Sequence, residues 1–60
     1  MATVYRYKIF DRRDNDWVVQ ISKGTKARIE ALGGRIIEGT AEEVDPSFID
    51  SEGRYVPNTD

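Results

Sequence analysis

The chain contains neither cysteine nor histidine, and this absence constrains its fold more than any other feature. No disulfide can form, and the usual zinc or iron ligands are missing. A chain of 60 residues buries only about 60% of the surface that its unfolded form exposes. One small apolar core must therefore hold it together, and oligomerisation is a common way for such domains to gain stability. We expect a homodimer without a bound metal or cofactor.

Two segments near the start alternate apolar and polar side chains with the period of a β-strand. They span residues 4–10 and 17–22, and the polar residues 11–16 between them are rich in turn formers. This pattern predicts a β-hairpin. The residues expected to share a face within each strand are Tyr5, Tyr7 and Ile9 in the first and Trp17, Val19 and Ile21 in the second.

A short helix is predicted over residues 26–32. Thr25 is a good N-cap, because its hydroxyl can accept a hydrogen bond from a free N–H of the first turn. Gly33 and Gly34 end the helix, since glycine takes the left-handed conformation without steric cost. Residues 35–39 then predict a third strand, placed beside the first and antiparallel to it.

Residues 41–44 are open to two interpretations. They can extend the third strand, or begin a helix, because Thr40 and Glu43 match a capping box. A helical turn is expected at residues 46–49, with Asp45 as N-cap and Pro46 at its first position. Residues 50–53 suit a turn, and residues 57–60 are expected to fray.

These elements predict one α+β domain over residues 1–56. Its order is β-β-α-β: a three-stranded antiparallel sheet with one short helix packed on one face, followed by an irregular acidic C-terminal segment. Trp17 is expected to be partly buried at the sheet margin. The predicted core is Tyr7, Ile9, Val19, Ile21, Ile29, Leu32 and Ile36 or Ile37.

Charge is divided unevenly along the chain, although the net charge is only −2. Residues 1–35 carry eight basic and four acidic side chains (+4), and residues 36–60 carry one basic and seven acidic ones (−6). The acidic segment can lie against the basic half, within one chain or across a dimer. It also contains apolar side chains, which predicts docking rather than disorder. Its candidate partner surface is Phe48, Ile49 and Tyr55.

The basic hairpin supports an alternative function in nucleic-acid binding. Charged side chains can follow a phosphate backbone while aromatic rings stack on bases. The aspartates of the hairpin loop and a pI near 5.0 argue against nucleic acid as the partner. The candidate contacts are Arg6, Lys8, Arg12 and Arg13.

The chain also lacks the usual equipment of an enzyme. Without histidine and cysteine there is no histidine base, no thiol nucleophile and no serine triad. No glycine-rich phosphate loop is present either. We therefore expect a non-catalytic protein.

Two stretches of the sequence resemble a known group of proteins. They run from Thr25 to Val44-Asp45, including Ile36-Ile37-Glu38-Gly39, and over the aromatic-rich segment Tyr5–Asp11. The chain is similar there to very small bacterial proteins, some of them carried by phages, for which no activity is known. The resemblance implies a bacterial, cytoplasmic, single-domain protein and no functional residue. The absence of a secretory signal pattern and of long apolar runs also predicts a cytoplasmic location without a membrane span.

The sequence thus predicts a small protein-interaction or structural module that associates with itself.

Overall fold

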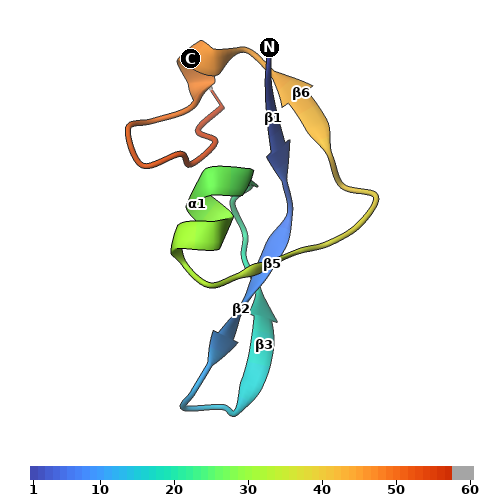
Figure 1. The fold of residues 1–60 in the computed structure, drawn as a ribbon, viewed down its shortest axis with the longest axis vertical. Coiled ribbons are helices and arrows are strands. Elements are labelled where there is room, and N and C mark those ends of the chain that lie inside the picture. The colour runs from blue at the N-terminus through green and yellow to red at the C-terminus, as the bar shows by residue number, and fades with distance from the viewer. Residues whose placement is uncertain (58–60) are drawn as a thin grey trace.

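The protein is a small α+β fold of two three-stranded antiparallel sheets and one short helix. A computed structural model describes residues 1–57, so most of the expected frayed tail at residues 57–60 lies outside the described residues. Sheet one has the strand order β4-β1-β6, and sheet two the order β3-β2-β5 (Figure 1). The elements are β1 (Ala2–Tyr5), β2 (Tyr7–Asp11), β3 (Asp16–Val19), β4 (Gly24–Thr25), α1 (Lys26–Ala31), β5 (Arg35–Ile36), β6 (Glu42–Val44) and the 3₁₀ turn η1 (Pro46–Phe48).

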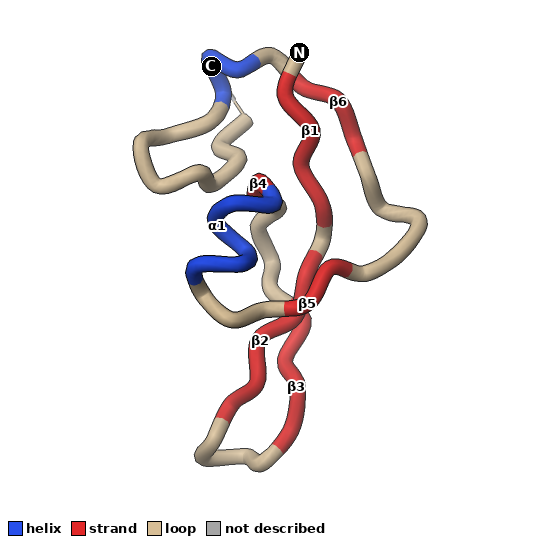
Figure 2. Tube along the Cα trace, viewed as in Figure 1, coloured by secondary structure: helices blue, strands red, loops and turns tan. Residues whose placement is uncertain are grey.

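The prediction of a single sheet is wrong, because the first predicted strand is divided at Arg6. Its N–H donates to the Thr40 hydroxyl at 3.1 Å, and its C=O accepts from the Ile37 N–H at 2.9 Å. The main chain of Arg6 thus bonds to a distant loop instead of continuing a strand ladder. β1 pairs with β4 and β6 on one side of this break, and β2 pairs with β3 and β5 on the other (Figure 2).

The β2–β3 hairpin is confirmed, and it projects from the rest of the molecule (Figure 1). Its turn spans residues 12–15, and Asn15 takes a positive φ of 54°, which asparagine tolerates better than most residues. β3 ends at Val19 rather than at the expected Ser22. The predicted place of the third strand is also confirmed, because β5 lies antiparallel beside β2.

The helix begins and ends on the predicted signals. The Thr25 hydroxyl accepts from the Arg28 N–H at 3.3 Å, and Gly33 follows the helix with a φ of 71°. Gly34 passes so close to β2 that an added Cβ would lie 2.9 Å from the Lys8 carbonyl oxygen. This close approach places the end of α1 against β2.

The C-terminal segment resolves the alternative left open by the sequence. Residues 42–44 form strand β6, so the helical interpretation is wrong. β6 does not extend the third strand either, because it pairs with β1 in the other sheet. The Thr40 hydroxyl bonds to the main chain of Arg6 and Ile37 and does not cap a helix. The turn at η1 is confirmed, with Asp45 accepting from the Ser47 N–H at 2.9 Å.

Among residues 1–57 four apolar side chains are buried, and the predicted core is wrong at three positions. Val19 is 49% exposed, because its pairing with Lys8 puts it on the side of the sheet opposite the buried Tyr7. Ile21 is 98% exposed and lies beyond the end of β3, and Leu32, at the C-cap of α1, is 42% exposed. Trp17 is half-buried, as predicted, and so are Ile9, Ile36 and Ile37. Among residues 1–57 no helix is long and apolar enough to cross a membrane. The buried side chains are Val4, Tyr7, Ile29 and Val44.

Candidate functional site

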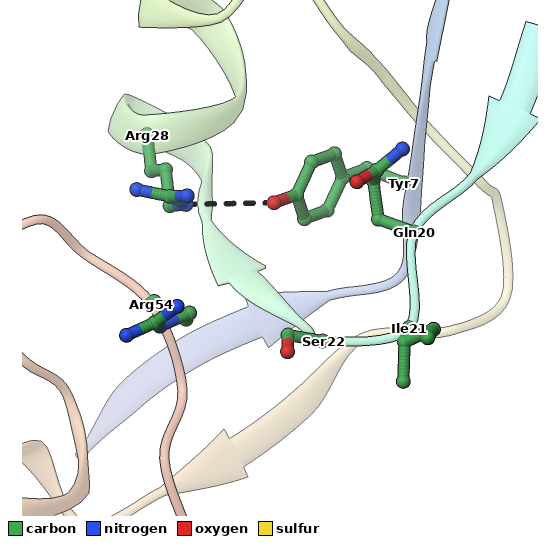
Figure 3. A pocket seen from close by; sticks show the side chains of 6 residues that line it. All are labelled: Tyr7, Gln20, Ile21, Ser22, Arg28 and Arg54. Atoms are coloured by element: carbon green, nitrogen blue, oxygen red, sulfur yellow. Dashed lines mark hydrogen bonds between the residues drawn. The ribbon is translucent and has the colours of Figure 1, made fainter.

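A polar pocket of about 190 Å³ opens beside the helix, between β2 and the C-terminal segment (Figure 3). The Arg28 guanidinium lies on one side of it and donates to the Tyr7 hydroxyl at 3.4 Å. Its lining residues are Tyr7, Gln20, Ile21, Ser22, Arg28 and Arg54.

The two arginines of this pocket are already paired with carboxylates. Arg28 lies 3.8 Å from Glu52 and also donates to its carbonyl oxygen, and Arg54 lies 3.3 Å from Asp50. The hydrogen bond with Tyr7, followed by the nearby carboxylates, raises the pKa of Arg28. The hydrogen bonds and ion pairs around the pocket therefore join α1 and β2 to the C-terminal segment. Because both arginines are paired, the pocket offers a ligand no uncompensated charge.

The acidic segment docks within its own chain, which was one of the two arrangements expected. Lys23 of the basic half lies 2.6 Å from Glu42 of β6, and Arg28 reaches Glu52. Such surface pairs contribute little stability individually. They nevertheless show that part of the charge asymmetry is neutralised inside one molecule.

The predicted partner surface of Phe48, Ile49 and Tyr55 is half-buried. Ile49 forms a β-bridge with Tyr55, and the Phe48 carbonyl accepts from the Val56 N–H at 2.7 Å. These residues hold the C-terminal loop closed, and their contact with a partner stays a prediction.

The four basic residues proposed for nucleic acid do not form one cluster. Arg12 and Arg13 line a shallow hollow at the hairpin turn together with Ile9 and Val18. Arg6 lies at the junction between the two sheets, and only Lys8 lies beside the Trp17 ring.

Lys8 belongs instead to a group of four side chains, which we call the cationic-aromatic face: Lys8, Phe10, Trp17 and Arg35. Phe10 is paired with Trp17, and Lys8 with Arg35, so the four side chains lie on one side of the sheet. The Trp17 ring centroid lies 5.6 Å from Lys8 Nζ and 5.4 Å from Arg35 Cζ. The Phe10 and Trp17 rings meet edge to face at 5.5 Å and 74°.

This geometry places Trp17 on the side of the sheet away from the buried Tyr7. Its ring lies on the face of Lys8, whereas Tyr7 and Ile9 lie on the opposite face. Sequence reasoning also missed Arg35, which the pairing of β5 with β2 brings to the hairpin. The predicted third strand was the available signal, but its register was not predictable from the sequence.

The outer edge of β3 is the second notable feature of the hairpin. β3 is the terminal strand of its sheet, and Val18, Val19 and Ile21 along this edge are exposed. The Gln20 N–H donates to the Tyr7 carbonyl at 2.9 Å, so by alternation Trp17 and Val19 direct their main-chain groups outward. The Asp16 carboxylate accepts the Trp17 N–H at 2.7 Å. Val19 is left with an outward N–H and an outward C=O.

Comparison of the chain with models of known protein families, with curated proteins and with solved structures found no match. The resemblance to small bacterial proteins therefore stays a prediction. Among residues 1–57 there is also no group of three or more potential ligand side chains that could hold a metal ion.

Proposed function

We propose that this chain is a non-catalytic binding module that associates with a second copy of itself through the outer edge of β3. The observation that carries the proposal is the outward main chain of Val19, which has no partner among residues 1–57 and is flanked by the exposed side chains of Val18 and Ile21. An exposed apolar edge strand is a template for pairing with another strand, and many proteins cover or block such edges.

A second copy fits this edge because the same strand can serve on both sides of a two-fold axis. Antiparallel pairing centred on Val19 lets two valines exchange two N–H···O=C bonds. Because only four apolar side chains are buried among residues 1–57, the monomer has a small core and would gain stability from self-association.

Asp45 and Asp50 serve as a cap and a turn former rather than as general acids. Hydrogen bonds from Ser47 lower the pKa of Asp45, and the hydrogen bond from the Arg54 N–H, followed by the one from Glu52, lowers the pKa of Asp50. A general acid at neutral pH needs a carboxyl pKa displaced upward. These two groups suit helix capping and turn formation instead.

Sedimentation equilibrium over a range of protein concentrations tests the proposal. We expect a dimer mass for the wild type and a monomer mass for Val19→Lys, because lysine on an edge strand opposes pairing. Val56→Lys is the matched control, since Val56 is 47% exposed but lies outside β3. It should remain a dimer. A wild-type monomer at every concentration, or equal dissociation of the two variants, would overturn the proposal.

A further inference from the structure

Two cations face each other across the β2–β5 pair without an acidic partner. Lys8 lies directly opposite Arg35, and among residues 1–57 neither side chain reaches a carboxylate within ion-pair distance. Like charges directly opposite in a sheet destabilise it. Trp17 partly compensates this repulsion, because both cations lie against its ring. The two positive charges are not neutralised within residues 1–57 and can attract an anion.

An exposed aromatic ring lies next to this cation pair. Phe10 is 41% exposed, and its ring packs edge to face with the Trp17 ring. This contact holds the Phe10 ring in place while part of the Phe10 ring stays open to solvent. Arg35 adds a planar guanidinium, which can stack on a base as well as contact a phosphate. Phosphate charge and stacked bases are the two features by which proteins bind single strands without reading their sequence.

We propose that the cationic-aromatic face binds single-stranded nucleic acid, with Lys8 and Arg35 contacting phosphates and Phe10 stacking on a base. A duplex is a poorer ligand, because its bases are already stacked on one another and cannot reach the Phe10 ring. The proposal does not depend on self-association, which uses the main chain of β3 rather than this face.

Two of the three hairpin aspartates that opposed this function in the sequence, Asp11 and Asp16, lie on the other side of the hairpin. Asp11 and Asp16 are paired with each other, one position beyond Phe10 and Trp17, and so belong to the opposite side of the hairpin. Their carboxylates accept main-chain N–H groups of Arg13 and Trp17. β6 and the C-terminal loop lie at the other end of the molecule from the hairpin turn (Figure 1). The molecule is 36 Å long, and charges in physiological salt are screened over about 8 Å.

Fluorescence anisotropy with labelled oligothymidylate at low salt tests the proposal. The wild type should bind at micromolar concentration and should bind the matching duplex more weakly. In Lys8→Gln/Arg35→Gln we expect affinity to fall about tenfold and the salt slope, log K against log salt, to become shallower by about 1.4, since each single-strand phosphate contact contributes about 0.7. Phe10→Leu should weaken binding several-fold and leave the slope unchanged.

Lys26→Gln is the matched control, because Lys26 is exposed at the start of α1, away from the face. It should change affinity less than twofold, and thermal unfolding of each variant should verify that it is folded. The proposal is overturned by absence of wild-type binding, or by an equal loss in Lys26→Gln. It is also overturned if labelled polyglutamate binds as tightly as oligothymidylate, which would assign the face to an acidic peptide.

Discussion

Lys8 of β2 and Arg35 of β5 lie directly opposite each other, and the Trp17 ring of β3 lies beside both cations. The three side chains come from three strands of one sheet. Repulsion between the cations and their attraction to the ring oppose each other. A cross-strand charge pair is worth about 0.2–1 kcal/mol and a cation–π contact about 0.5–1 kcal/mol at an exposed site, so the two effects are of similar size.

Replacing Arg35 by glutamate separates these two effects. Arg35→Glu removes the repulsion and adds an attractive cross-strand pair with Lys8, at the cost of one contact with Trp17. We expect the free energy of unfolding to rise by about 0.5 kcal/mol in urea titrations at low salt. Adding Lys8→Gln should abolish the gain. A lower stability for Arg35→Glu would show that the contact with Trp17 outweighs the repulsion.

Two helix positions distinguish the observed core from the one predicted by the sequence. Ile29 is 1% exposed, whereas Leu32 is 42% exposed. We expect Ile29→Ala to lower the free energy of unfolding by about 3 kcal/mol, and Leu32→Ala by less than about 1 kcal/mol. Chemical denaturation measures both. Similar losses for the two variants would contradict the packing described for α1.

Proline substitutions at neighbouring positions of β3 test the direction of its main-chain groups. The Val19 N–H points outward, so Val19→Pro should leave the hairpin folded and prevent association. The Val18 N–H points toward β2, so Val18→Pro should disrupt the hairpin. Circular dichroism and sedimentation together separate the two outcomes. A folded Val18→Pro variant with a disrupted Val19→Pro variant would reverse the assignment.

The hydrogen bonds accepted by Asp45 and Asp50 predict acid sensitivity. They lower each carboxyl pKa below the ordinary value of 3.8 in the folded protein. The stability from a lowered pKa is present above that ordinary value and is lost as the pH falls through the lower, folded value.

The midpoint of thermal unfolding should therefore fall as the pH is lowered from about 5 to below the ordinary aspartate pKa. The midpoint of the double variant Asp45→Asn/Asp50→Asn should fall less steeply with decreasing pH. Asp14→Asn is the control, because the Asp14 side chain accepts no hydrogen bond within residues 1–57. A wild-type curve parallel to that of the double variant would contradict the prediction.

Elements governed by local chemistry were predictable from the sequence. The cap of α1 at Thr25, its end at Gly33 and the turn begun by Asp45 and Pro46 each depend on residues within a few positions of one another. The hairpin was predictable for the same reason. Its two strands and its turn form a continuous segment of the chain.

Features that depend on distant residues were not predictable. The division of the first strand requires Thr40, which is 34 positions from Arg6. The side of the sheet occupied by Trp17 depends on its register with Phe10, since a shift by one residue would move Trp17 to the face of Ile9. Arg35 joins the same face only through the pairing of β5. The alternation within each strand was visible in the sequence, but it did not relate the faces of different strands.

Hydrogen exchange of the Val19 amide, measured at several protein concentrations, tests self-association through β3 most directly. The Gln20 N–H is bonded to Tyr7 inside the hairpin and serves as the internal reference. Protection of Val19 should increase with concentration while that of Gln20 stays nearly constant, because only a second copy can bond the outward Val19 N–H. A Val19 amide that exchanges equally fast at all concentrations, in a protein whose Gln20 amide is protected, would contradict this account.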